Sequence, residues 1–195
     1  MSTKASFKRD VANHQLRIRL DEPGYKHLVC AVPGSSVFRF EIATFPNYLC
    51  FAGGMGEFVF SRESDMLNFF KTSAHNGAPN YDYWAEKCCG VDRSSGIKEF
   101  HLKAFISVIN DLCEELEGEE ERAFVKKELK CYPPISNGNE AFRWASELIY
   151  NGETVFPDFW ECDFEVYTHR FKWCCHSILW AIDQYDAVKA DQEIP

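Results

Sequence analysis

Apolar and polar side chains alternate between residues 15 and 60, which is the pattern of half-buried β-strands. The alternation opens with Leu16, Ile18 and Leu20 set against Gln15, Arg17 and Arg19. Turn-forming Pro, Gly, Asn and Asp residues separate the apolar segments. The pattern therefore predicts an antiparallel meander with short strands at 15–20, 25–32, 37–43, 48–52 and 57–60.

Apolar positions recur every three or four residues after residue 60, which is typical of amphipathic helices. This spacing predicts helices at 65–71, 80–89, 98–117, 119–131 and 139–150. A separate short helix is predicted before the strands, over 4–14. The clearest pattern predicts a long final helix over 162–188, where Phe164, Tyr167, Phe171 and Ile178 fall on one stripe.

Strands followed by helices indicate an α+β fold, in which an antiparallel sheet of four or five short strands packs with a helical C-terminal part that includes the long final helix. A chain of 195 residues fits one domain of ordinary size. We therefore expect a single domain over 1–195, with a β-meander portion at 15–60 and a mainly helical portion at 61–188.

Charge is distributed unevenly along the chain. The 21 Lys and Arg and 30 Asp and Glu give a net charge of -9, but residues 1–80 carry +2 and residues 81–195 carry -11. A negative field opposes general binding of DNA or RNA, because such binding draws its affinity from neutralised phosphates. The composition favours a partner with a basic surface instead.

The nine cysteines are an odd number and include two adjacent pairs, so they imply no disulfide framework. The opening MSTKASFKRD lacks the apolar stretch of a secretory signal, and no apolar run is long enough to cross a bilayer. We expect a protein of the reducing cytoplasm, with no membrane partner.

The sequence carries no strong motif for metal binding or for catalysis. The sequence has no Cys-x-x-Cys and no His-x-x-x-His, so it predicts no metal and no cofactor. The final helix carries His169 and His176 near Cys175, which leaves a small hydrolase-like enzyme as an alternative. Exposed helix faces often carry such residues, and no catalytic residue is predicted.

Gly53, Gly54 and Gly56 raise the question of a phosphate-binding loop. Such a loop leads into a helix, whereas GGMGEFVF continues into another predicted strand without a following Lys-Ser or Lys-Thr. The glycines predict a tight hairpin turn.

A dense acidic run spans residues 114–121. Carboxylates at 119–121 suit a helix N-terminus, but those at 114–117 lie near a predicted C-terminus, where the helix dipole disfavours them. A solvated surface is the ordinary explanation, and a docking site for a basic partner is the alternative. The predicted partner-binding residues are Glu114, Glu115, Glu117, Glu119, Glu120 and Glu121, with a second acidic set at Asp158, Glu161, Asp163 and Glu165.

Several long stretches resemble a family of small accessory proteins encoded by bacteriophages, prophages and related mobile elements. They are MSTKASFKRDVANHQ at 1–15, MGEFVFSRESDMLNFF at 55–70, NYDYWAEK at 80–87 and DFWECDFEVYTHRFKWCCHSILWAIDQYDA at 158–187. Residues 110–155 match least well. In the family an Asp usually precedes the turn Met and a Thr follows the Gly, whereas this chain has Gly54 and Glu57, which weakens any proposal for chemistry at the turn.

The resemblance assigns no catalytic residue. It implies a counter-defence role, in which the protein binds a host protein or ribonucleoprotein complex with a basic surface, such as a CRISPR effector, in the bacterial cytoplasm. A structural phage protein is a further alternative, and the sequence does not specify an oligomeric state.

Overall fold

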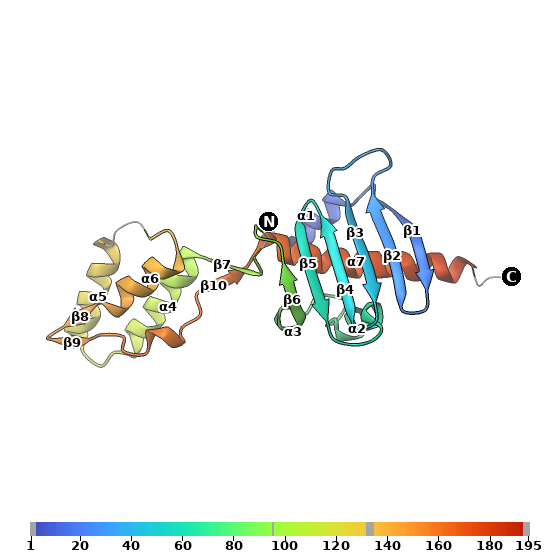
Figure 1. Ribbon diagram of the computed structural model, residues 1–195. Helices are drawn as coiled ribbons and strands as arrows, with labels where there is room; N and C mark the ends of the chain where they lie inside the picture. The colour runs from blue at the N-terminus through green and yellow to red at the C-terminus, as the bar shows by residue number, and fades with distance from the viewer. Residues whose placement is uncertain (1–2, 95, 132–134, 193–195) are drawn as a thin grey trace. The chain divides into compact units, whose positions relative to one another are not determined.

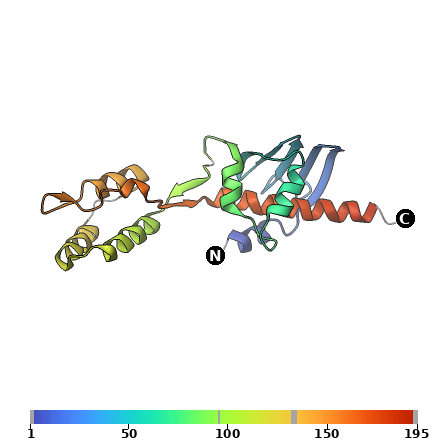
Figure 2. The ribbon, with the colours of Figure 1, turned by 90° about the horizontal axis from the view of Figure 1, so that it is seen from below.

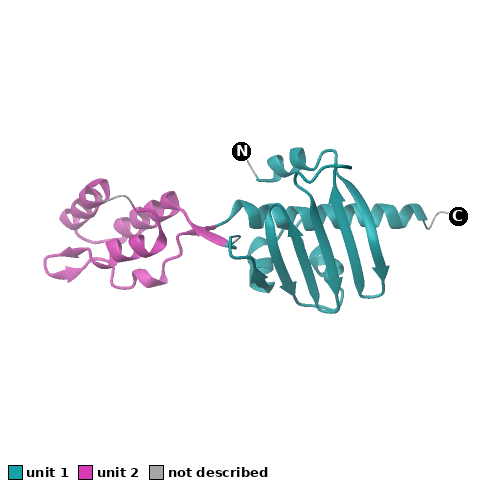
Figure 3. Ribbon diagram, turned by 45° about the horizontal axis from the view of Figure 1, so that its top comes forward, with its two compact units in different colours: residues 1–97, 167–195 teal, residues 98–166 magenta. Residues whose placement is uncertain are grey.

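The computed structural model describes residues 3–94, 96–131 and 135–192 (Figure 1). The chain divides into two compact units (Figure 3). Unit 1 comprises residues 1–97 and 167–195, and unit 2 comprises residues 98–166. Unit 2 is thus inserted between two segments that together form unit 1. The expectation of one domain over 1–195 stays a prediction, which an excision experiment below addresses.

Unit 1 is built on a six-stranded antiparallel meander in which each strand pairs with its neighbour in the sequence. The strands are β1 Gln15–Glu22, β2 Tyr25–Ala31, β3 Phe40–Phe45, β4 Tyr48–Gly53, β5 Gly56–Ser61 and β6 Cys88–Val91. This confirms the α+β class and the expected meander. The sixth strand lies where the sequence predicted the end of a helix.

Strands β4 and β5 join through a tight turn, as the glycines predicted. Gly53 pairs with Gly56 across the β4–β5 hairpin, and Gly56 has a φ of 111°. A Cβ on Gly53 would lie 2.6 Å from the carbonyl oxygen of Arg39, so only glycine fits beside the neighbouring strand. The glycine-rich segment is therefore a hairpin turn in the structure.

Helices of unit 1 lie on one side of the sheet (Figure 2). They are α1 Thr3–Asp10, α2 Met66–Ser73, α3 Tyr81–Lys87 and α7 His169–Gln192. Asp65 and Asn80 cap α2 and α3 by accepting hydrogen bonds from backbone N–H groups in their first turns. The sheet contributes alternate residues to the shared core, including fully buried Phe40, Phe58 and Phe60.

The long helix α7 supplies the centre of this core. Trp173 is 1% exposed and packs edge-on against Phe7 of α1 and Phe40 of β3. Its indole N–H donates to a carboxylate oxygen of Asp10 at 3.0 Å, so a large ring is buried without an unpaired donor.

The predicted boundary of the last helix at residue 162 is wrong, because α7 begins at His169. Thr168 accepts a hydrogen bond from the backbone N–H of Phe171 through its hydroxyl, which caps the helix there. Residues before it form the 3-10 helix η1 Phe159–Glu161 and the strand β10 Glu165–Tyr167.

Unit 2 has a separate, mainly helical core. Its elements are β7 Lys98–Phe100, α4 Leu102–Glu115, α5 Glu119–Cys131, α6 Gly138–Ser146, the hairpin of β8 Ile149–Tyr150 and β9 Glu153–Thr154, and η1. Strand β7 pairs with β10, so the chain segments that enter and leave the unit lie together. Phe105 is fully buried and meets Phe159 and Phe164 edge-on, which anchors η1 to α4.

Candidate functional site

The whole net charge of the chain resides in unit 2. This unit holds seven Lys and Arg against sixteen Asp and Glu, a net charge of -9, whereas unit 1 holds fourteen of each. All ten acidic residues predicted to bind a partner lie in unit 2. The asymmetry seen along the sequence is therefore an asymmetry between two compact bodies.

The acidic run at 114–121 does not form one continuous helix face. Glu114 and Glu115 end α4, and Glu119, Glu120 and Glu121 open α5 after a break at Gly118. The three carboxylates in the first turn of α5 suit its N-terminus electrostatically. That half of the run therefore has a structural explanation.

Some predicted residues already have partners within the unit. Glu114 forms an ion pair with Lys126 at 2.8 Å, and this contact holds the pKa of Glu114 below its usual value. Asp163 forms an ion pair with Lys98 at 2.5 Å, with the same effect on its pKa. Because Glu114 and Asp163 are already paired, they contribute to the negative field of unit 2 more than to a surface that is free to bind a partner.

A groove in unit 2 brings three other predicted residues together. It has a volume of about 330 Å³, and Glu115, Asp158 and Glu161 line it from the end of α4 and from the segment around η1. Among the described residues none of these three carboxylates makes an ion pair or a hydrogen bond. Glu115 stands 43 residues before Asp158 and 46 before Glu161 in the sequence, so the fold brings it together with them.

The rest of the groove is apolar. Its lining includes Leu112 and Leu116 from the C-terminal end of α4, and Val155, Phe156, Pro157 and Phe159 from the segment after β9. Phe156 and Phe159 are buried, so the walls are fixed by the core of the unit. The groove is an apolar channel with an acidic rim.

The field in this groove is negative. The thiol of Cys162 lines it, and the pKa of that thiol is raised, first by desolvation and then by the negative charges of Glu161 and Glu115. A carboxylate-rich site of this kind favours a cation over an anion.

Trp160 is a functional candidate that sequence reasoning did not single out. It occupies the middle of η1 between buried Phe159 and exposed Glu161, and 67% of its surface is exposed. An exposed Trp beside unpaired carboxylates is typical of an interface anchor.

The residues of the enzyme alternative do not form a catalytic arrangement. Cys175 is fully buried, and burial raises the pKa of its thiol well above the usual value, which opposes formation of a nucleophilic thiolate. His176 is buried and binds the hydroxyl of Tyr81 at 2.9 Å, whereas His169 is exposed at the start of α7.

Within residues 3–94, 96–131 and 135–192, no group of three or more His, Cys, Asp and Glu side chains is arranged to hold a metal ion. The same residues include no helix with the length and apolar character needed to span a membrane. All nine cysteines are free thiols. Comparisons with protein-family models, with curated proteins and with solved structures find no match.

Proposed function

We propose that this protein is a counter-defence factor that acts without catalysis, by docking unit 2 onto a basic surface of a host nucleic-acid-handling complex in the bacterial cytoplasm. A CRISPR effector is the specific partner that the resemblance to phage accessory proteins implies. Occupation of that surface excludes the DNA or RNA that it normally binds. The groove lined by unpaired Glu115, Asp158 and Glu161 is the observation that carries the proposal.

The groove has the chemistry to take Arg or Lys side chains. Such side chains present an aliphatic stem and a charged head, so the stem packs on Leu116 and Phe156 while the head meets the rim carboxylates. Hydrogen bonds between guanidinium and carboxylate are charge-assisted and about twice as strong as neutral ones. Trp160 adds a rigid apolar contact beside the rim.

The charge of unit 2 supports fast and selective association. A net charge of -9 on 69 residues creates a field that steers a basic surface toward the groove. At physiological salt the Debye length is about 8 Å, so steering acts mainly at close approach and weakens as salt rises. Association should therefore slow as ionic strength increases, with a smaller change in the dissociation rate.

The proposal is tested with the full chain and a panel of purified, guide-loaded CRISPR effectors, using binding kinetics and target-DNA cleavage at about 50 and about 200 mM salt. The test variant is Glu115→Lys/Asp158→Lys/Glu161→Lys. The control variant, Glu99→Lys/Glu147→Lys/Glu153→Lys, reverses the same number of exposed charges in unit 2 outside the groove.

We expect the groove variant to lose affinity for the inhibited effector by roughly 100-fold or more, because each reversal replaces an attraction by a repulsion. The control should lose less than about 10-fold, through weakened steering. Trp160→Ala should weaken binding by roughly 10-fold with the salt dependence unchanged. Equal losses in the two triple variants would contradict the groove as the site, and failure to bind or inhibit any effector would contradict the proposed function.

A further inference from the structure

The sheet of unit 1 has a second face on which none of the described helices of that unit lies. Helices of the unit lie on one side (Figure 2). Fully buried Leu28 and Cys30 of β2 belong to the core cluster shared with those helices, so they face that side. Their neighbours Val29 and Ala31 belong to the opposite face, because successive strand residues alternate. Arg17 of β1 pairs with Val29, so it also stands on this second face. Arg19 lies between Ile18 and Leu20, where the register with β2 shifts, and it lines the same pocket as Arg17 and Val29.

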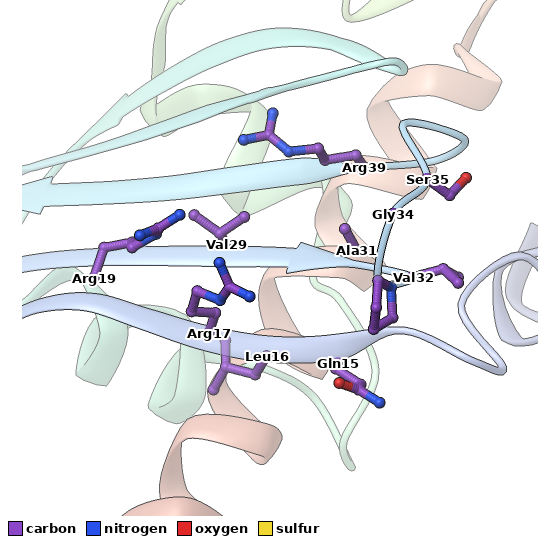
Figure 4. Close-up of a pocket in the computed structure, with 11 residues that line it drawn as sticks. Gln15, Leu16, Arg17, Arg19, Val29, Ala31, Val32, Gly34, Ser35 and Arg39 are labelled. Carbon is purple, nitrogen blue, oxygen red and sulfur yellow. The ribbon is translucent and has the colours of Figure 1, made fainter.

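A pocket of about 250 Å³ lies on this face near the β1 edge of the sheet. Its lining includes Arg17 and Arg19 from β1, Arg39 from the residue before β3, and the loop after β2 that contains Gly34 and Ser35. Figure 4 shows the three arginine side chains around Val29, with the loop closing one end. Strand β1 and the residue before β3 thus direct three guanidinium groups to one small volume.

Among the described residues, neither Arg17 nor Arg19 makes an ion pair or a side-chain hydrogen bond. Arg39 contacts the carboxylate of Glu41, which also binds Nε2 of His27 at 2.5 Å. These contacts lower the pKa of Glu41, with the hydrogen bond from His27 as the largest cause, so its negative charge is already matched by its own neighbours.

Other groups complete the pocket. Val29, Ala31 and Val32 give it an apolar floor. The hydroxyl oxygen of Ser35 accepts a hydrogen bond from the backbone N–H of Val37, which leaves the hydroxyl proton available to a ligand. Guanidinium forks, a hydroxyl donor and an apolar floor together match a ligand that has one phosphate and one flat or apolar part.

We propose that this pocket binds a small organic phosphate of about the size of a nucleoside monophosphate. The guanidinium groups of Arg17 and Arg19 hold the phosphate, since the planar fork of arginine matches phosphate oxygens in a bidentate manner. The base or sugar lies over Val29 and Ala31, where an arginine side chain also stacks on it. The proposal concerns unit 1 and does not rest on the docking function of unit 2.

Charge favours a small ligand over a nucleic-acid strand. Unit 1 has equal numbers of acidic and basic residues, and the whole chain carries -9, so a polyanion is repelled along most of its length. A monophosphate meets only the local excess of positive charge in the pocket. The pocket volume of about 250 Å³ also suits a ligand of about one nucleotide.

Calorimetric titration of the full chain tests this proposal with adenosine 5′-monophosphate and uridine 5′-monophosphate as probes. Adenosine, inorganic phosphate and a ten-residue single-stranded oligonucleotide serve as comparison ligands. The test variant is Arg17→Gln/Arg19→Gln, and the control is Arg62→Gln, which removes an exposed arginine of unit 1 that does not line the pocket. Circular dichroism confirms that each variant is folded.

We expect at least one monophosphate to bind, with adenosine and inorganic phosphate roughly 10-fold weaker or more, because each lacks half of the recognised chemistry. The double variant should lose that affinity by roughly 10-fold or more, whereas the control should keep it. Absence of monophosphate binding, or equal affinity in the double variant, would overturn the proposal. Tighter binding of the oligonucleotide would overturn it in favour of a strand-binding face.

Discussion

Buried His176 makes the stability of unit 1 depend on pH in a way that can be isolated. Its ring is 9% exposed, stacks on Phe7 and lies 2.9 Å from the hydroxyl of Tyr81 through Nε2. Burial raises the pKa of Tyr81 to about 12, so the phenol keeps its proton beside the imidazole. Burial first, and the nearby positive charge of Lys4 second, lower the pKa of His176 to about 4.

A folded-state pKa below the unfolded value of about 6.5 means that the unfolded chain takes up the proton first as pH falls. The contribution of His176 to the free energy of unfolding is fully present above pH 6.5 and is lost as pH decreases toward 4. A difference of 2.5 units corresponds to about 3 kcal/mol. Between pH 7 and pH 5 the loss due to His176 amounts to about 2 kcal/mol.

Urea unfolding at pH 7 and pH 5, applied to the parent protein and to His176→Gln, measures this loss. Protonation of carboxylates also lowers the stability of the fold as pH falls. Asp21 is one of these groups, because its contact with Lys26 is the chief cause that lowers its pKa to about 2. They are common to both proteins, so the comparison removes their contribution. The variant should lose about 2 kcal/mol less than the parent between the two pH values, whatever its stability at pH 7.

The control is His169→Gln, which replaces an exposed histidine on the same helix and removes no buried imidazole. It should show the pH dependence of the parent protein. If His176→Gln loses as much stability as the parent, to within about 0.5 kcal/mol, the imidazole is not held neutral by burial and the reasoning is refuted. A titration of the ring by NMR with a midpoint near 6.5 would refute it as well.

Three further outcomes follow from packing. Gly53→Ala should destabilise the protein by about 1–3 kcal/mol in urea unfolding, because the new Cβ meets Arg39 O at 2.6 Å; Gly54→Ala, where nothing lies within 4 Å, should have a much smaller effect. Iodoacetamide should modify exposed Cys89 and Cys131 in the native protein, but fully buried Cys174 and Cys175 only after unfolding. Mass spectrometry of peptides measures the modification, and equal rates for the four thiols in the native protein would contradict the burial of Cys174 and Cys175. A chain of residues 98–166 should retain helical circular dichroism and a cooperative thermal transition, since it has its own buried cluster; a non-cooperative transition would support the single domain expected from sequence.

Local patterns predicted much of unit 1, because strand alternation and turn residues act over a few positions. They could not predict which core each apolar residue joins. Phe164 fits the stripe of the last helix by spacing, yet it packs with Phe105 and Phe159 in unit 2. Strand β6 was missed for a different reason: Cys88-Cys89-Gly90-Val91 is short and lacks alternation, and it pairs with β5 through tertiary contacts.

For the candidate sites, too, local sequence patterns could not predict which distant residues the fold brings together. Composition located the excess of carboxylates, and all ten predicted residues are in unit 2, but charge density alone did not distinguish paired Glu114 from unpaired Glu115. The groove depends on residues far apart in sequence. Alternation placed Arg17 and Arg19 on the polar face of a strand, whereas the pocket also needs the register with β2 and the loop beside Arg39.

The insertion of unit 2 into unit 1 sets an order for synthesis on the ribosome. The strands β1 to β6 are made first, but the helix that fills their core, α7, is translated only after all of unit 2. At typical translation rates of about 5–20 residues per second, the sheet waits several seconds for Trp173 and its neighbours, with its apolar face uncovered. The strongly acidic insert emerges during that interval, and we expect its like charge to repel neighbouring nascent chains while the apolar face is exposed.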